Sequence, residues 1–140
     1  MIQKFLEIKI DTGGKTLINV SKQIIDFIDG SKIKNGILNL SILHTSASLI
    51  VQENASKNVL VDLENFYNKL VPMDEKLYFH KIEGIDDMPA HIKTTLTNTN
   101  LSFSIIENKL KLGEWQGIYL FEHRLERYFR SIFCHIIGEL

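Results

Sequence analysis

The sequence has little cysteine, no excess of one charge and no long hydrophobic run, and each absence argues against a class of protein. The single cysteine, Cys134, has no partner for a disulfide within the chain, which fits a reducing compartment. The 16 basic residues stand against 17 acidic ones, so the basic excess typical of nucleic-acid binders is missing. Apolar stretches fall well short of the roughly 20 residues that span a bilayer, and Lys4 and Glu7 interrupt any signal-peptide core. We therefore expect a cytoplasmic protein that binds neither nucleic acid nor membrane.

Several short motifs of known chemistry are missing as well. The sequence contains no phosphate-cradling glycine loop, no paired-glycine dinucleotide motif and no Gly-x-Ser-x-Gly elbow, so no organic cofactor is predicted. The 140 residues, of which 44% are hydrophobic, fit a single domain spanning 1–140. A chain of this size can bury enough surface to fold without a metal or a disulfide.

The spacing of apolar residues predicts more strands than helices. Helices are expected from the N-cap Ser21 to Gly30, from Asn54 to just before Pro72, and from Asp86 or Asp87 to about Leu96. The predicted strands, mostly joined by short turns, are 2–10, 16–20, 36–43, 48–52, 101–106, 109–112, 115–123 and 131–138. This order favours an α+β fold, a single compact domain with largely antiparallel strands.

The first polar cluster, His44 to Ser48, directly follows an apolar strand. A histidine in this position can bind a metal ion or transfer protons, and the hydroxyls of Thr45 and Ser46 can hold phosphate oxygens. The alternative is a turn in which the Thr and Ser side chains bond only to the backbone.

The second cluster brings His80 and His91 together with three carboxylates, Glu83, Asp86 and Asp87. Such a density of ligands suits zinc if the histidines dominate and magnesium if the carboxylates do. The spacing matches no standard zinc signature. The alternative is that the aspartates cap a helix and that His91 is solvated.

The third cluster lies on the strand predicted at 115–123. Gln116 and Glu122 share one face of that strand, and His123 points to the other. Glu122 is the preferred ligand or acid–base group, with Gln116 beside it, and His123 is expected at the surface or at a subunit contact. Among the nearby arginines, Arg130 is kept as a candidate for binding phosphate, because a guanidinium pairs bidentately with oxyanions.

In this order the clusters closely resemble the YjbQ-like family, whose members are identified as secondary thiamine-phosphate synthases. The resemblance covers nearly the whole chain and rests on four motifs: His44-Thr45-Ser46-Ala47-Ser48, Glu53-Asn54-Ala55, His80-x-x-Glu83-Gly84-x-Asp86-Asp87-Met88-Pro89-Ala90-His91-Ile92-Lys93, and Trp115-Gln116-Gly117-Ile118 with Glu122-His123-Arg124.

The resemblance implies a compact β-sandwich with about three helices, a homotrimer in the cytoplasm, and a weak, secondary synthase activity. The reaction would join a pyrimidine diphosphate to a thiazole phosphate at a histidine-rich site, with a divalent metal, zinc or magnesium. The residues expected there are the metal ligands His44, His80 and His91, the catalytic groups Glu122, His91 and Gln116, and the substrate-binding residues Thr45, Ser46, Lys93 and Arg130.

Two departures from the family pattern affect the substrate more than the fold. Glu114 stands where the family usually has threonine, and residues 97–100 replace a Gly-Pro-Ser-like turn. Two other functions therefore stay open: metal-assisted hydrolysis of a phosphorylated metabolite, and a non-catalytic trimeric protein that binds a metal or a metabolite.

Overall fold

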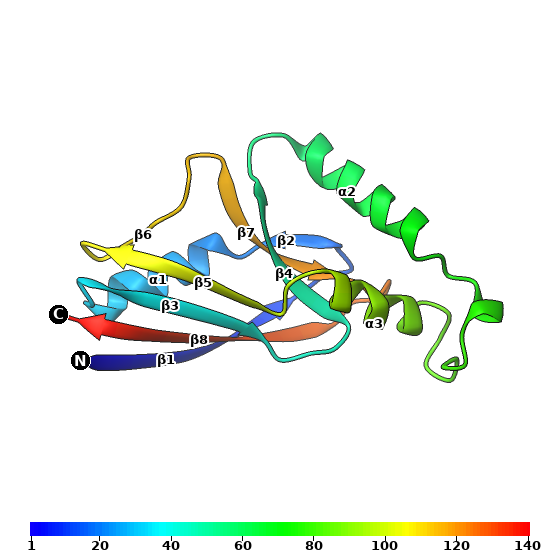
Figure 1. Cartoon of the computed structure of the whole chain (residues 1–140), viewed down its shortest axis with the longest axis horizontal. Helices are drawn as coiled ribbons and strands as arrows, with labels where there is room; N and C mark the ends of the chain where they lie inside the picture. The colour runs from blue at the N-terminus through cyan, green and yellow to red at the C-terminus, as the bar shows by residue number, and fades with distance from the viewer.

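The computed structural model describes all 140 residues and contains two antiparallel β-sheets with three α-helices (Figure 1). The elements follow in the order β1 (Ile2–Asp11), β2 (Leu17–Asn19), α1 (Ser21–Ser31), β3 (Asn35–Ile42), β4 (Ala47–Glu53), α2 (Lys57–Leu70), the short 3₁₀ helix η1 (Glu75–Leu77), α3 (Asp87–Leu96), β5 (Asn100–Ile106), β6 (Lys109–Leu110), β7 (Gln116–Glu122) and β8 (Phe129–Glu139). The predicted α+β class, with antiparallel strands and three helices, is confirmed.

The larger sheet has the strand order β1-β8-β3-β5-β6, and the smaller one has the order β2-β7-β4. β1 and β8 pair along their whole length, from Ile2 opposite Gly138 to Asp11 opposite Phe129. This pairing places the two ends of the chain side by side (Figure 1).

The hydrophobic core lies between the two sheets and α1. β8 shows how the strand period builds it, since Ile132, Cys134 and Ile136 are fully buried while the residues between them are partly exposed. The core cluster also includes Ile24 and Ile28 of α1. Burial raises the pKa of the Cys134 thiol to about 12, so this thiol is inert as a nucleophile in the folded protein.

β7 is the central strand of the smaller sheet and is covered on both faces. Ile118 and Leu120 belong to the core cluster on one face. On the other face the ring of Phe121 meets that of Tyr67 from α2, with the ring centroids 5.5 Å apart. His123, just beyond the strand and on the face of Phe121, is therefore only 4% exposed. The prediction that His123 lies at the surface or at a subunit contact is wrong.

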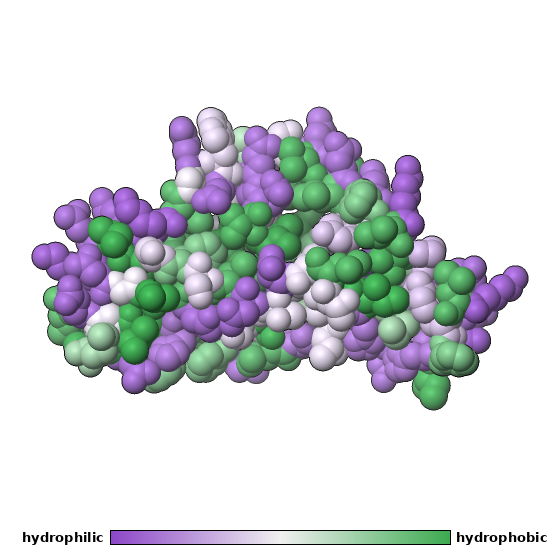
Figure 2. Space-filling view, in the orientation of Figure 1, coloured by the Kyte–Doolittle hydropathy of each residue, from purple (hydrophilic) through white to green (hydrophobic).

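The end of the molecule formed by α2, α3 and the segment between them exposes many apolar side chains. α2 has no buried residue, and hydrophobic surface gathers at this end in Figure 2. The large apolar side chains that are more than half exposed there are Val61, Phe66, Leu70, Leu77, Phe79, Ile82, Ile85 and Leu96. No helix is long and apolar enough to cross a membrane.

The start of α2 and the capping of α3 differ from the predictions for local reasons. The second helix begins at Lys57 rather than Asn54, because β4 continues to Glu53 by pairing with Gln116 of β7. At the start of α3, Asp86 occupies the N-cap position, but its side chain makes no capping hydrogen bond. Its carboxylate instead bonds to Arg124 and Leu125.

Candidate metal site

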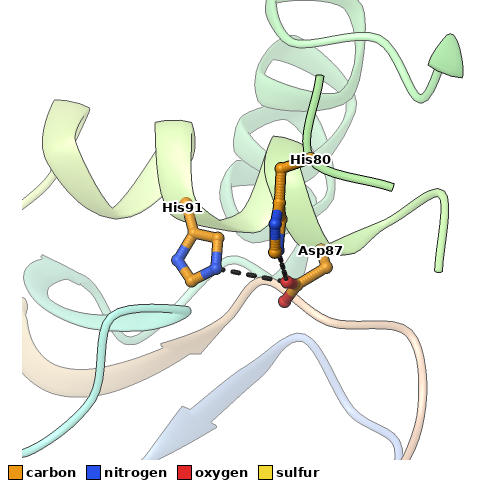
Figure 3. Close-up of side chains that lie close together, drawn as sticks. All are labelled: His80, Asp87 and His91. Carbon is orange, nitrogen blue, oxygen red and sulfur yellow. Dashed lines mark hydrogen bonds and ion pairs between the residues drawn. The ribbon is translucent and has the colours of Figure 1, made fainter. Parts of the chain in front are cut away.

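Three side chains converge at the start of α3: His80, Asp87 and His91 (Figure 3). Asp87 and His91 lie four residues apart on α3 and so share one face of the helix, whereas His80 comes from the loop before it. Both rings point at the Asp87 carboxylate, with His80 Nε2 at 2.6 Å and His91 Nε2 at 3.2 Å from Oδ2. The three ligand atoms all lie within 4.8 Å of one another.

The orientation of the His91 ring is fixed by the turn that precedes β4. His91 Nδ1 lies 2.9 Å from the carbonyl oxygen of Thr45, and a carbonyl only accepts, so Nδ1 carries the donated proton. In the neutral ring Nε2 is then an acceptor, and it faces Asp87 Oδ2, which is also an acceptor. A second proton on the ring, or a cation held between the two groups, satisfies both atoms.

Arg124 holds the carboxylates of Asp86 and Asp87 in place. Its Nη1 donates to Asp87 Oδ1 at 2.8 Å, and its Nε donates to Asp86 Oδ2 at 2.9 Å. Burial opposes ionisation of both carboxyls. The hydrogen bonds from Arg124 to Asp86 and from His80 to Asp87, together with the charge of Arg124, nevertheless hold the pKa of each below its ordinary value. Asp87 is therefore an anion with one oxygen committed to Arg124 and the other turned to the histidines.

Two imidazole nitrogens and one carboxylate oxygen form a donor set that suits zinc and other first-row transition ions better than magnesium. Asp87 is 2% exposed, whereas the side chains of His80 and His91 are 42% and 32% exposed. The group is thus anchored in the protein and open toward solvent. Three protein ligands with an open side are typical of catalytic metal sites rather than structural ones.

His44 is not part of this group. Its Nε2 accepts a hydrogen bond of 2.8 Å from the backbone N–H of Ser131, and its Nδ1 lies 3.4 Å from Arg130 Nη1. Burial, followed by the charge of Arg130, lowers the pKa of His44 against the opposing effects of Glu122 and Glu7. His44 and His91 nevertheless open on the same surface hollow of about 250 Å³, lined by His44, Thr45, His91, Thr94, Thr95 and Thr99.

Glu122 is held away from that hollow by a buried ion pair. Arg130 donates to it twice, through Nε to Oε2 at 2.6 Å and through Nη2 to Oε1 at 2.5 Å. The N–H of Arg124 also donates to Oε1. Gln116 is not beside Glu122, because the two residues stand at opposite ends of β7, roughly 20 Å apart at the rise of an extended strand. Gln116 closes a turn by accepting from the N–H of Gly113.

Lys93 and His123 line a separate small pocket between α2 and β7. Lys93 donates to Asn68 Oδ1 at 2.7 Å, and burial lowers its pKa against the opposing charges of Glu64 and Asp86. Residues two positions apart on a helix do not share a face, so Lys93 points away from the side of α3 that carries His91. His123 Nε2 lies 2.9 Å from Ser48 Oγ, and burial, then the charges of Lys93 and Arg130, lowers its pKa to about 3.

The turn residues Thr45 and Ser46 contact the site through their backbone. The Thr45 carbonyl holds His91, and the Ser46 carbonyl accepts from His123 N at 3.3 Å and from Arg130 Nη2 at 3.3 Å. From the sequence, Asp87 is expected either among carboxylates that bind a metal or as a helix cap, but it is not one of the named ligands, and Arg124 has no assigned role. The four-residue spacing of Asp87 and His91 was the signal for a shared helix face.

Comparisons with known proteins find one family along nearly the whole chain. The model of the UPF0047 protein YjbQ-like family matches residues 6–139. A UPF0047 protein of Synechocystis is 45% identical over 131 residues, covering 94% of this chain and 89% of the relative. The UPF0047 protein YjbQ of Escherichia coli O157:H7 is 38% identical over 138 residues, or 98% of each chain.

Solved structures show the same fold. A protein of Sulfolobus solfataricus P2 superposes with a TM-score of 0.86 over 99% of both chains, at 24% identity, which shows the fold alone. A YjbQ/UPF0047 protein of Clostridium acetobutylicum gives a TM-score of 0.83 at 29% identity, covering 94% of this chain and 99% of the other.

Proposed function

The chain belongs to the YjbQ-like family, and from this premise we propose that it is a metal-dependent enzyme of the thiamine-phosphate synthase type. The observation that carries the proposal is the convergence of His80 Nε2, Asp87 Oδ2 and His91 Nε2 within 4.8 Å, on the side where the group meets solvent. The reaction would join a pyrimidine diphosphate to a thiazole phosphate, and both substrates are small phosphorylated metabolites.

A divalent ion bound at the site would make it favour an anionic substrate, because the charges already present cancel. Three positive and three negative side chains, buried or nearly so, lie around α3 and the end of β7, and their formal charges cancel: Lys93, Arg124 and Arg130 against Asp86, Asp87 and Glu122. A divalent ion bound by His80, Asp87 and His91 would add positive charge that stabilises a departing diphosphate. Adding two positive charges to a neutral cluster makes the site electrostatically complementary to phosphorylated substrates.

The protein residues contribute by holding the ligands in place. Arg124 fixes Asp87 Oδ1, and the Thr45 carbonyl holds the His91 ring, so that Oδ2 and Nε2 face the same point. Such outer hydrogen bonds commonly change metal affinity 10- to 100-fold. Glu122, predicted as a catalytic group, is proposed instead as a positioning residue, since its oxygens are bound to Arg130 and to the Arg124 N–H.

Zinc titration tests the metal. We expect wild-type protein to bind one zinc per chain in competition with a chromophoric chelator, and Asp87→Asn to bind about 100-fold more weakly. His135→Gln is the matched control, because His135 lies on β8 and bonds only to Gln3. Equal affinity in wild type and Asp87→Asn would remove the assignment of these ligands.

Growth of a thiamine auxotroph that lacks its main synthase tests the reaction. We expect the wild-type gene to restore growth without added thiamine, and His91→Ala to fail although the protein accumulates in soluble form. If soluble wild-type protein gives no growth, and the purified enzyme forms no thiamine phosphate from the two halves, this reaction is wrong for the protein.

A second candidate is metal-assisted hydrolysis of a phosphorylated metabolite. It is favoured by the donor set itself, because two histidines and one carboxylate are a common zinc set in hydrolases. Release of inorganic phosphate from a phosphate ester, dependent on both zinc and Asp87, would support it over the synthase. Zinc binding with neither activity would favour a protein that binds the metal without catalysis.

The assembly and the location of the protein follow from the same proposal. We propose a homotrimer in the cytoplasm, and the exposed apolar side chains of the α2–α3 end support an assembly larger than a monomer. Light scattering coupled to size exclusion measures this directly. A mass near the 16.1 kDa of one chain would contradict it.

A further inference from the structure

His44 is surrounded by hydrogen-bond donors that it cannot all satisfy. The N–H of Ser131 points at Nε2 from 2.8 Å, and Arg130 Nη1 points at Nδ1 from 3.4 Å. A neutral imidazole accepts at one nitrogen and donates from the other. Both ring nitrogens therefore face donors, while only one of them can accept.

No protonation state of His44 removes the conflict. With the proton on Nε2, the ring would oppose the Ser131 N–H at 2.8 Å. With protons on both nitrogens, both contacts would pair donor with donor. The remaining state carries the proton on Nδ1, keeps the short bond from Ser131 and leaves two N–H groups directed at each other, one from Nδ1 and one from Arg130 Nη1.

Of the three guanidinium nitrogens of Arg130, Nε and Nη2 have hydrogen-bond acceptors and Nη1 does not. Its Nε and Nη2 bind Glu122, and Nη2 also reaches the Ser46 carbonyl. The guanidinium lies over the ring of Tyr128, 4.8 Å from the centroid, and Arg130 is 5% exposed. The only hydrogen-bonding atom near Nη1 is His44 Nδ1, which in this state carries a proton and cannot accept. A buried donor without an acceptor is costly, because it has lost its hydrogen bonds to water and gained none in the protein.

We propose that His44 Nδ1–H and Arg130 Nη1–H together bind an oxygen of a phosphate group that enters through the threonine-lined hollow beside His91. One oxygen that accepts from both nitrogens removes the donor–donor contact with a small shift of either side chain. The occupant is the phosphate of a substrate, and that identification rests on the proposed function. The anion site itself does not require the metal.

The number of unused donors favours phosphate over carboxylate. Thr94 and Thr95 donate to the carbonyls of Ala90 and Ile92, and their hydroxyls are committed. Thr45 and Thr99 make no side-chain hydrogen bond and line the same hollow. Two hydroxyls and two N–H groups make four donors, which suit the oxygens of a phosphate better than the two oxygens of a carboxylate.

Titration of metal-free protein with inorganic phosphate tests this site. The chelator-treated protein is titrated at constant ionic strength, with acetate in a parallel series. We expect one saturable phosphate site per chain and at least tenfold weaker binding of acetate. Nitrogen-15 spectra of the imidazoles are expected to place the proton on Nδ1 of His44 and to show that signal shifting with phosphate. A proton on Nε2, no saturation, or equal binding of acetate would overturn the proposal.

Two variants connect the binding to the residues. His44→Phe keeps a ring of similar shape without N–H groups and is expected to weaken phosphate binding about tenfold. Thr99→Val removes one hydroxyl with no change in the backbone bond from Ile42 N to the Thr99 carbonyl, and a threefold to tenfold loss is expected. Unchanged affinity in Thr99→Val and in a folded His44→Phe would contradict the site. Since no metal is present, failure of zinc binding affects only the proposed function, and failure of phosphate binding only this inference.

Discussion

His91 and His44 each make one hydrogen-bonding contact that lacks a matching partner, and the two contacts lack opposite kinds of group. The His91–Asp87 pair brings two acceptors together and needs a proton or a cation, whereas the His44–Arg130 pair brings two donors together and needs an anion. Both histidines line one hollow, and Thr45 joins them, because its carbonyl holds His91 and its amide follows His44. The comparison shows that one surface can offer a site for a cation and a site for an anion although the charges of the side chains around it cancel.

The largest expected effect is on stability and concerns the buried ion pair between Arg130 and Glu122. Arg130→Leu leaves the Glu122 carboxylate, which is 0% exposed in its side chain, without its partner. Removing one member of a buried pair costs about 3–5 kcal/mol of stability, measurable by urea unfolding. Arg127→Leu is the control, since Arg127 pairs with Asp11 at the surface, and no measurable change is expected. If the two variants were equally stable, Arg130 would not be anchored as described.

Zinc stabilisation separates the acceptor pair from the donor pair. Ligand at 100 times its dissociation constant stabilises the folded state by about 2.7 kcal/mol, and we expect this increase in wild type and in His44→Phe. Asp87→Asn, which binds zinc about 100-fold more weakly, should keep only about 0.4 kcal/mol of it, because the anionic ligand is lost. Loss of the zinc effect in His44→Phe would place His44 among the metal ligands and would end the distinction between the pairs.

Acid sensitivity is expected to come from a third histidine that belongs to neither pair. The pKa of His123 is about 3 in the folded protein, against an ordinary value of about 6.5 when unfolded. Below pH 6.5 the unfolded chain takes up a proton that the folded chain does not, so stability falls as the pH falls. Between pH 7 and 5 the loss is about 2 kcal/mol.

His123→Gln should flatten this dependence, since glutamine does not titrate. Unfolding free energies at pH 7, 6 and 5 for both proteins measure it. An equally steep decline in the variant would assign the acid sensitivity to another group.

The smallest expected effect lies at the residue shared by both pairs. Thr45→Val keeps the carbonyl that holds His91 and removes the hydroxyl that faces the hollow. We expect phosphate affinity to fall about fivefold, the size of one neutral hydrogen bond of about 1 kcal/mol. Zinc affinity should stay within about twofold. Equal losses for both ligands would mean that the two sites are not independent.

Strands were predictable because burial on one face leaves an alternating pattern that needs no knowledge of the partner strand. The same alternation gave His123 the correct side of β7 but the wrong environment. A strand with both neighbours in its sheet, and with α2 over its second face, has no solvent side. Which elements cover a face depends on contacts between distant parts of the chain, and the local pattern does not contain them.

The sequence was enough to predict which segments form the candidate site, but not what each residue does there. His80, Asp87 and His91 lie in one short stretch, so their proximity could be expected. The division between His44 and that group could not, because it depends on Ser131 and Arg130, more than 80 positions away in the sequence. Likewise Asp87 is set by Arg124, a contact across 37 residues.

The single buried thiol has a practical consequence. Cys134 is fully buried in β8, between β1 and β3, and its pKa is raised to about 12. A thiol-reactive dye will therefore not label the native molecule and will label it only when the central strands separate. The rate of labelling would report global opening on unmodified protein, one dye per chain, with no engineered probe and no second cysteine to confuse the signal.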